Sequence, residues 1–286
     1  MTRRVCGRTA SEEPAIVILG CGYTGTRVAW KMACRGRRVL ATSRDPSRLR
    51  LPETAVTIRV DTAEPSTVEQ LAKLPEGCLV LHSVPLVEEP AKLSDPTPLL
   101  LRPLEGLAAR VVYLSTTSVY GAQTAVDART PPAPRTAKER LRVAAEEAVK
   151  SGRWSWMILR PAAIYGPGRG MQVSLPRGEF KLAGDGSNWV SRIHVDDLAE
   201  LACAALLSKA QGAWPVADLE PARSREVAAF VAELTGSKMP ESSPAAQLHS
   251  TRQANRRVDG TEVLKLLGLT LQFPSYRIGI PKSLGL

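Results

Sequence analysis

The sequence predicts an α/β protein built on a Rossmann-type, doubly wound parallel sheet with a small additional C-terminal lobe. Two observations predict this fold class. Short apolar runs alternate with helix-like stretches from residue 15 to residue 159, and a Gly-x-Gly-x-x-Gly pattern stands directly after the first run. Such alternation is typical of a parallel sheet that is covered on both faces and binds ligands at the carboxyl ends of its strands.

The elements follow one another in the order that this fold requires. The first βαβ unit comprises an expected strand at 15–19, a helix at 24–35 and a strand at 39–42. Further strands are expected at 56–60, 78–81, 111–114 and 156–159, and further helices at 67–74, 97–107, 136–150, 197–207 and 224–234. We therefore expect a flexible tail over 1–13, a Rossmann domain over 14–170 and a mixed region over 171–286. That last region forms a small substrate-side lobe and packs in part on the sheet.

Composition limits the class of protein. With 286 residues and 44% hydrophobic content, the chain fits one large α/β unit or a nucleotide domain with a small appendage. The five cysteines form no C-x-x-C pair and the three histidines are isolated, so we expect reduced thiols and no metal site. No apolar run follows the arginines near the start, so neither a signal peptide nor a membrane anchor is expected. The expected location is the cytoplasm.

The formal charge of +10 would attract polyanions. However, arginines concentrate between Arg27 and Arg59, where a bound dinucleotide would place its phosphates. No basic run is interleaved with aromatic residues for stacking bases, so we do not expect a nucleic-acid partner. A basic nucleic-acid-associated protein remains a third and weaker hypothesis.

The glycine pattern predicts a dinucleotide site. Gly20 permits the tight turn, Gly22 lets a pyrophosphate approach the backbone, and Gly25 lets the helix pack closely on the strand. Tyr23 and Thr24 are further candidates for cofactor binding, because they stand at the amino end of the helix expected at 24–35, which faces the anion.

The end of the second strand favours NADP over NAD. An NAD site usually places a carboxylate there, but this chain has Ser43 and Arg44, a hydroxyl and a guanidinium that would bind a 2′-phosphate. A solvated surface role for Arg44 stays open. After the third strand, Asp61 and Thr62 are placed to meet the adenine, although Asp61 could equally serve a turn.

Four segments resemble the extended short-chain dehydrogenase/reductase superfamily, the NAD-dependent epimerase/dehydratase group. They are Gly20–Gly25, Ser115–Gly121, Leu159–Gly168 and Ile193–Leu198, and they occur in the family order. The tail resembles a short, atypical branch, with Arg257–Asp259, Leu266–Gly268 and Phe273–Arg277. The resemblance implies a Rossmann fold, a bound nicotinamide dinucleotide and a substrate cleft.

The resemblance also implies a catalytic hydroxyl residue, a tyrosine and a lysine four positions later. Thr116 matches the hydroxyl position, but the helix that should carry Tyr-x-x-x-Lys has Lys138 and Arg142 at the two places and no tyrosine. Arg142 could still bind the nicotinamide ribose. Lys138 would need desolvation or a neighbouring charge to act as a tuned acid.

Other proton-transfer candidates lie within the matching segments. Tyr120 and Tyr165 are more typical of packing or substrate contact than of catalysis, and His194 is typical of a structural residue before a helix that an aspartate would cap. His82 ends the fourth strand, where family members pass the nicotinamide ribose, but a buried hydrogen-bonded histidine explains it equally well. The Asp-Glu pair that the dehydratases carry is replaced by Thr117–Ser118, which disfavours sugar dehydration.

We therefore predict an NADP(H)-binding reductase or epimerase that acts on a small polar or sugar-derived substrate. The alternative is a catalytically silent NADP(H)-binding sensor that regulates a protein partner, and loss of the tyrosine is its best support. A homodimer through the helices at 97–107 and 136–150 is a further expectation, although a monomer remains open because the second helix is unusually charged.

Overall fold

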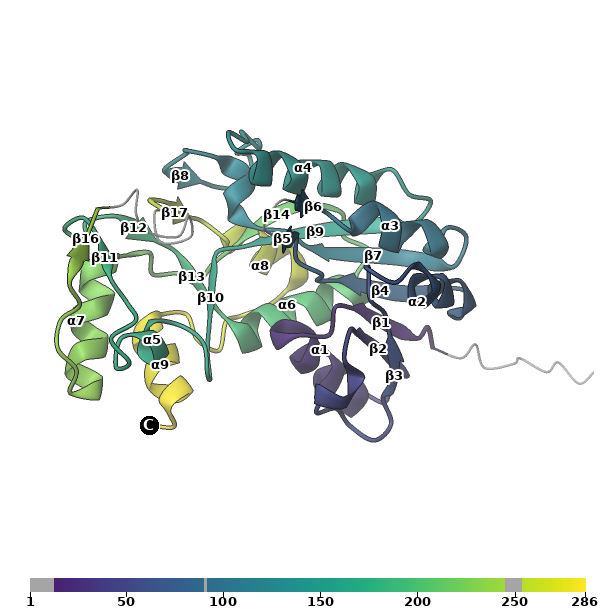
Figure 1. The fold of residues 1–286 in the computed structure, drawn as a ribbon, viewed down its shortest axis with the longest axis horizontal. Helices are drawn as coiled ribbons and strands as arrows, with labels where there is room; N and C mark the ends of the chain where they lie inside the picture. Colours follow the sequence, from purple (N-terminus) through teal and green to yellow (C-terminus); the bar gives the residue numbers. More distant parts are fainter. Residues whose placement is uncertain (1–12, 90–91, 245–253) are drawn as a thin grey trace, which may run out of the picture.

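The computed structural model describes residues 13–89, 92–244 and 254–286, so residues 1–12 of the expected tail lie outside the described residues. A seven-stranded parallel sheet forms the centre, in the order β14-β9-β7-β4-β1-β2-β3 (Figure 1). Its strands are β1 (Ile16–Leu19), β2 (Val39–Ser43), β3 (Val56–Arg59), β4 (Cys78–His82), β7 (Ala108–Leu114), β9 (Ser155–Pro161) and β14 (Gly212–Val216). Because the chain moves outward from β1 in both directions, the sheet is doubly wound, and the predicted fold class is confirmed.

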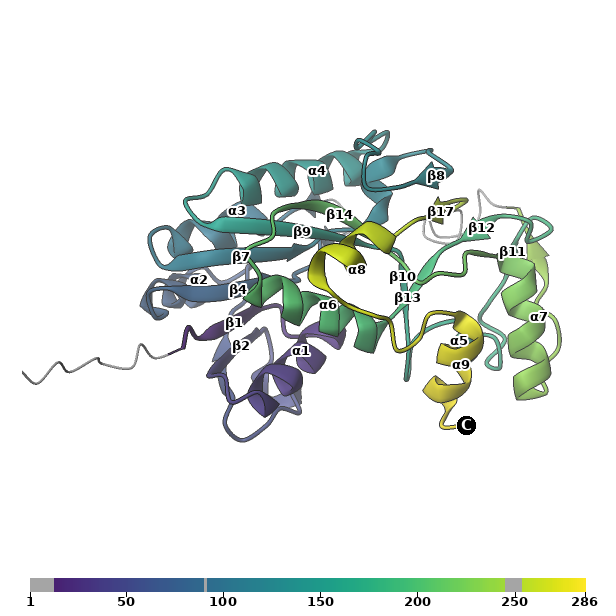
Figure 2. The same ribbon diagram turned by 180° about the vertical axis from the view of Figure 1, so that it is seen from behind.

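Helices cover both faces of the sheet, as the continuous apolar strands require. Ile16 and Ile18 of β1 pack on the face that carries α1 (Tyr23–Cys34), α6 (Val195–Leu207) and α8 (Thr261–Leu267). Val17 and Leu19 point to the other face, under α2 (Pro65–Glu69), α3 (Thr97–Leu101) and α4 (Ala137–Lys150). Figure 2, seen from behind, shows α6 and α8 beside the strands.

The strand β14 was not predicted, although it completes the sheet. Its sequence contains Pro215, which lacks the amide hydrogen that a central strand needs and so argues against a strand. The structure places β14 at the edge, where it pairs with β9 alone, so the proline leaves no neighbouring strand without a hydrogen bond.

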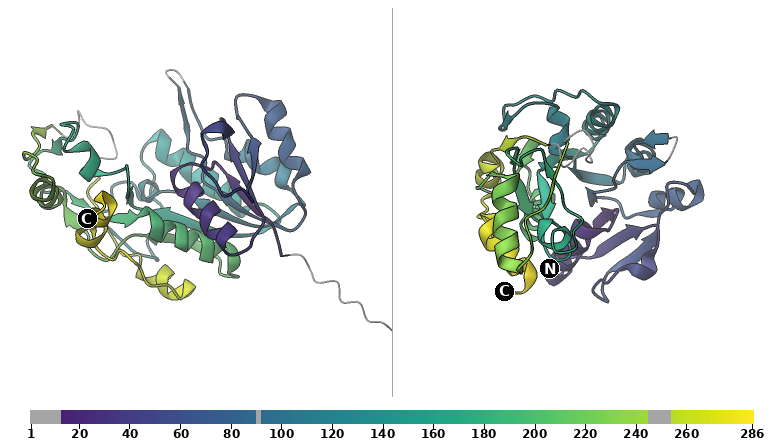
Figure 3. Two further views of the ribbon diagram at one scale, coloured as in Figure 1. Left: turned by 90° about the horizontal axis from the view of Figure 1, so that it is seen from below. Right: turned by 60° about the vertical axis from the view of Figure 1, so that its left-hand side comes forward.

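The rest of the C-terminal half forms a small lobe beside the carboxyl end of the sheet, drawn in green and yellow in Figure 3. Its helices are α5 (Met171–Ser174), α7 (Ser224–Thr235) and α9 (Tyr276–Leu284), and the lobe has a core of its own around Tyr165, Val227 and Tyr276. Four two-stranded pairs of β-strands lie in and around this lobe. They are β10 (Ala163–Tyr165) with β13 (Arg192–His194), β11 (Leu182–Ala183) with β16 (Ser242–Ser243), β12 (Trp189–Val190) with β15 (Ala222–Arg223), and β8 (Ala125–Val126) with β17 (Arg257–Val258).

The described residues also form a hairpin and four short 3-10 helices. The hairpin consists of β5 (Val87–Glu89) and β6 (Lys92–Ser94), and the 3-10 helices are η1 (Pro46–Arg48), η2 (Gln70–Lys73), η3 (Arg102–Leu104) and η4 (Thr117–Tyr120). Among the described residues, no helix has the length and apolar character needed to span a membrane.

Candidate functional site

The glycine-rich turn joins β1 to α1, and its three glycines have different surroundings. Gly20 has a φ of +77°, which favours glycine, and a Cβ there would lie 2.8 Å from the Val84 side chain. A Cβ on Gly25 would lie 3.0 Å from the Ile18 side chain and would push α1 away from β1. Among the described residues other than its two chain neighbours, a Cβ on Gly22 would come within 4 Å of one group, the Gly20 carbonyl oxygen at 4.0 Å, so the space in front of Gly22 is open. These surroundings match the three roles that the pattern predicts.

The amino end of α1 faces this turn without a cap. Among the described residues, no side chain bonds to its first amides, which belong to Tyr23 and Thr24, and its first turn carries no acidic residue. The preceding backbone is tied to β2 instead: the Cys21 amide donates to the Thr42 carbonyl (2.7 Å) and the Gly20 amide to Thr42 Oγ1 (3.1 Å). Helix amides without a side-chain partner attract an anion, so this turn fits a phosphate group.

Most arginines between residues 27 and 59 are already paired with carboxylates, so few arginines of this cluster lack a carboxylate partner among the described residues. The pairs are Arg27 with Asp196 (2.8 Å), Arg35 with Glu200 (2.5 Å), Arg37 with Glu13 (3.1 Å), Arg48 with Asp45 (2.9 Å) and Arg59 with Glu64 (2.6 Å). Two of them bind acidic residues of α6, because α1 packs against that helix. These arginines therefore stabilise the fold through ion pairs, in addition to adding positive charge to this part of the protein.

Arg44 differs from these arginines because its guanidinium has no carboxylate partner among the described residues. It follows the last residue of β2 and is exposed. The nearby Asp45 carboxylate accepts from Ser47 Oγ (2.6 Å) and pairs with Arg48, and the Ser47 hydrogen bond helps to hold its pKa below the usual range. The Ser43 hydroxyl also bonds to the Asp45 backbone (3.2 Å). The acidic residue at this strand end thus serves its own turn, and the guanidinium of Arg44 remains available.

The structure gives local partners to the residues predicted after β3 and at the end of β4. Asp61 Oδ1 accepts the backbone amide two residues on (3.0 Å), which is the turn role that we left open, and Thr62 lies half-buried beside it. His82 is fully buried, with Nε2 2.8 Å from Thr97 Oγ1 and its ring stacked on Tyr113 at 4.9 Å. Burial lowers the pKa of His82 to about 3. The structure therefore places the His82 ring in the core and not at the cleft surface.

Thr116 lies at the carboxyl end of β7, half-buried at the edge that carries the glycine-rich turn. Its hydroxyl oxygen accepts the Ser118 amide (3.2 Å) and caps η4, so its hydroxyl hydrogen remains available to a ligand. The preceding Ser115 donates to Glu146 of α4 (2.6 Å), which fixes the backbone beside Thr116.

Glu146 belongs to a buried network that sequence reasoning did not identify. Its carboxylate binds Arg160 of β9 through two hydrogen bonds of 2.6 and 3.0 Å, and the two side chains are 0% and 5% exposed. Arg160 also donates to the Tyr120 hydroxyl (3.1 Å). Arg160 lies in one of the four segments that resemble the family, which was a signal, whereas Glu146 lies outside them, in the helix expected at 136–150.

This network decides the position of Tyr120. The tyrosine is fully buried, its hydroxyl accepts from Arg160, and burial raises its pKa. The structure therefore gives Tyr120 a packing role, which corrects its selection as a catalytic candidate. Tyr165 is also buried, and His194 Nδ1 caps α6 by accepting the Asp196 amide (3.2 Å), so the cap is a histidine and not an aspartate.

The two residues at the places of the family's tyrosine and lysine are held by other partners. Lys138 pairs with Glu88 of the β5–β6 hairpin. Arg142 donates to the Tyr113 hydroxyl (2.7 Å), lies 3.7 Å from Asp95 Oδ2 and is 13% exposed. Neither residue hydrogen-bonds to the hydroxyl of Thr116. The structure thus gives Lys138 and Arg142 partners of their own and joins neither of them to Thr116 by a hydrogen bond.

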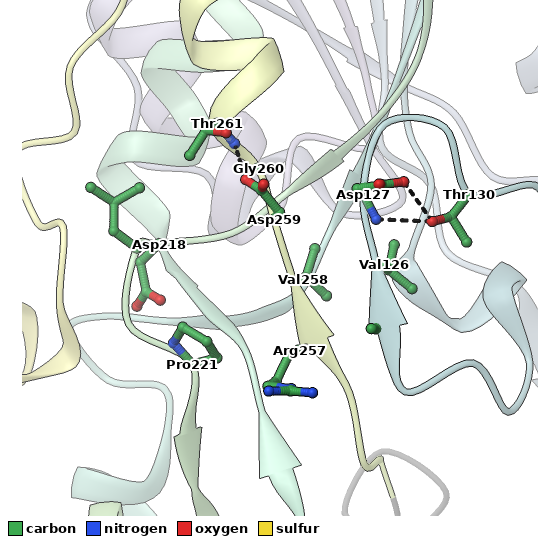
Figure 4. Close-up of a pocket in the computed structure, with 12 residues that line it drawn as sticks. Val126, Asp127, Thr130, Asp218, Pro221, Arg257, Val258, Asp259, Gly260 and Thr261 are labelled. Atoms are coloured by element: carbon green, nitrogen blue, oxygen red, sulfur yellow. Dashed lines mark hydrogen bonds between the residues drawn. The ribbon is translucent and has the colours of Figure 1, made fainter.

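A separate pocket of about 670 Å³ lies between the β8–β17 pair, the loop after β14 and the start of α8 (Figure 4). Its lining residues are Ala125, Val126, Asp127, Thr130, Asp218, Leu219, Pro221, Arg257, Val258, Asp259, Gly260 and Thr261. Two of its aspartates serve turns, Asp127 by accepting from Thr130 (2.7 Å) and Asp259 by accepting the Thr261 amide (2.9 Å). No residue of the glycine-rich turn lines it, so this pocket is distinct from the predicted dinucleotide cleft.

Asp218, which lines this pocket, should make stability depend on pH. Its side chain is buried, neither carboxylate oxygen has a hydrogen-bond partner of good geometry among the described residues, and burial raises its pKa to about 8. The unfolded chain ionises Asp218 near pH 4, so between pH 4 and 8 the folded state holds the extra proton and its stability falls as pH rises. We expect Asp218→Asn to gain stability relative to the wild type as pH increases from 5 to 8, measured by chemical denaturation.

Asp259→Asn, on the same pocket, is the matched control because its carboxylate is exposed and bonded to a backbone amide. The free energy of unfolding of each variant is compared with that of the wild type at the same pH. This comparison cancels the pH dependence that other groups, such as the buried His82, contribute to both proteins. A constant difference for Asp218→Asn across this pH range would show that Asp218 does not keep its proton in the folded state.

Comparisons with known proteins agree with this architecture. The NAD dependent epimerase/dehydratase family matches residues 16–217. A conserved protein of unknown function from Silicibacter pomeroyi has 29% identity and a TM-score of 0.78 over 96% of this chain and 99% of its own. The UDP-glucose 4-epimerase of Thermus thermophilus, solved with NAD, has 20% identity and a TM-score of 0.79 over 96% and 98% of the two chains.

A shorter match connects the chain to a reductase. The 3-diazoavenalumate denitrifying reductase of a Streptomyces species is 33% identical over 107 residues. The match covers 35% of this chain and 35% of that protein, so it spans about a third of each.

Proposed function

Because the chain belongs to the NAD dependent epimerase/dehydratase family, we propose that its glycine-rich cleft binds NADP(H) for reductase or epimerase chemistry on a small polar substrate, such as a sugar derivative. When bound, the nicotinamide would donate or accept a hydride. The chain itself would bind and orient the dinucleotide and the substrate. This proposal predicts a cytoplasmic enzyme.

The observation that carries the proposal is the uncapped amino end of α1 beside the open space at Gly22. A phosphate group in that space would meet helix amides that no side chain satisfies. The NAD in the Thermus epimerase and the reductase match to the Streptomyces protein agree with dinucleotide chemistry. Thr116, with its hydroxyl hydrogen unused, is the best candidate in the cleft to bond a substrate oxygen.

The preference for NADP rests on Arg44. A guanidinium binds a 2′-phosphate through charge-assisted hydrogen bonds, whereas an aspartate there would repel it. We expect NADPH to bind at least about 10-fold more tightly than NADH, and Arg44→Asp to remove that preference. Titration with both reduced dinucleotides, followed by nicotinamide fluorescence, measures this directly.

Arg38→Asp is the matched control, since it makes the same change of charge at the amino end of the same strand, on another exposed arginine. It should leave the preference unchanged. Equal affinity of the wild type for NADPH and NADH would contradict the NADP assignment. Failure of the wild type to bind either dinucleotide would overturn the proposed function, and binding without turnover of any tested substrate would favour the regulatory sensor.

A further inference from the structure

A second arginine at the cleft lacks a carboxylate partner. Arg169 lies in the turn that follows β10, is exposed, and makes no ion pair with any described residue. We propose that its guanidinium binds the pyrophosphate of the dinucleotide together with the amides of α1. This inference rests on the proposed function and assigns to its cofactor a binding residue nearly 150 positions from the glycine pattern.

The turn that carries Arg169 is held in one conformation. The Gly166 amide donates to the Arg169 carbonyl (2.9 Å), and the Arg169 amide donates to the Gly166 carbonyl (3.0 Å). The amide group of Gln172, which is 2% exposed, donates to the same two carbonyls at 3.0 Å each. The base of the Arg169 side chain is therefore positioned before any ligand arrives, which lowers the entropic cost of binding.

This turn rests directly on the start of α1. The Tyr23 hydroxyl donates to the Pro167 carbonyl (3.0 Å), and a Cβ on Gly166 would lie 2.7 Å from that hydroxyl oxygen. The Arg169 guanidinium carbon lies 5.3 Å from the centre of the Tyr23 ring. Because Tyr23 is the first residue of α1 and follows Gly22, Arg169 is held beside the place where the pyrophosphate would lie.

The guanidinium of Arg27, which also lies beside Tyr23, already has hydrogen-bond partners. Arg27 also packs on the Tyr23 ring, at 4.3 Å, but it pairs with Asp196 (2.8 Å) and donates to the Tyr23 carbonyl (2.8 Å). A pyrophosphate carries two negative charges, and the helix end offers only about half a positive charge. Arg169 supplies the missing positive charge, and its planar group can hold two phosphate oxygens at once.

The experiment compares the affinities of NADPH and NADH for the wild type, Arg169→Ala and Arg169→Lys. Both dinucleotides contain the pyrophosphate, so Arg169→Ala should weaken both by the same factor, about 10-fold, as expected for loss of a charge-assisted hydrogen bond. Arg169→Lys should recover part of the affinity. Arg177→Ala, an exposed arginine eight positions on, is the control and should bind as the wild type does. Thermal melting of each variant checks its fold.

The affinities of the wild type and of Arg169→Ala distinguish failure of the pyrophosphate role from failure of the proposed function. Unchanged affinities of folded Arg169→Ala would overturn the pyrophosphate role while dinucleotide binding by the wild type still stands. A loss confined to NADPH would also overturn it, because it would assign Arg169 to the 2′-phosphate. If the wild type binds neither dinucleotide, the proposed function fails and this inference fails with it.

Discussion

Gly22→Ala is expected to lose dinucleotide binding while the protein remains folded. A methyl group at this position meets only the Gly20 carbonyl oxygen, at 4.0 Å, in the described structure, so the fold can accept it. Alanine in place of glycine before a helix should cost no more than about 1 kcal/mol of stability. The same methyl group would stand where the pyrophosphate approaches, and we expect about 100-fold weaker binding of NADPH, the upper end of the cost of overfilling a close contact.

Gly25→Ala provides the contrast within the same turn. Its Cβ would lie 3.0 Å from the Ile18 side chain and 3.2 Å from the Gly20 carbonyl oxygen, so it should lower the free energy of unfolding by about 1–3 kcal/mol. Fluorescence titration and chemical denaturation of both variants distinguish a steric block of the ligand from damage to the fold. Wild-type affinity in Gly22→Ala would show that the dinucleotide phosphates do not bind in front of Gly22.

The largest loss of stability is expected for Glu146→Ala. This change removes the carboxylate that binds Arg160 at 2.6 and 3.0 Å and accepts from Ser115 at 2.6 Å. The Arg160 side chain is 5% exposed and would keep an uncompensated buried charge. Removal of one partner of such a pair costs about 3–5 kcal/mol, which chemical denaturation at neutral pH would detect.

Glu147→Ala, one residue further along α4, is the matched control. Its carboxylate pairs with Lys150 at 2.7 Å but is 64% exposed, and such a surface pair contributes at most about 0.5 kcal/mol. The double variant Glu146→Leu/Arg160→Met should recover much of the loss, since it removes both buried charges. A Glu146→Ala variant as stable as Glu147→Ala would show that Arg160 finds another partner or water.

The fold and the dinucleotide turn were predicted because their signals are local. The apolar run at β1 is buried on both faces, and the three glycines follow it at fixed spacing, so strand, turn and helix can be recognised within a few residues. The strand β14 escaped prediction because only its position at the edge of the sheet makes Pro215 acceptable. That position is a property of the whole sheet.

The sequence by itself determined the doubly wound sheet, the glycine-rich turn and the hydroxyl and guanidinium at the end of β2. Only the tertiary structure decided which charged and polar groups remain available to a ligand. It buried Tyr120 against Arg160, paired Arg27 with Asp196, and brought the turn of Arg169 onto the first residue of α1. The physical reason is that an ion pair or a burial depends on partners far away in the chain, whereas a helix, a strand or a tight turn depends on its own residues.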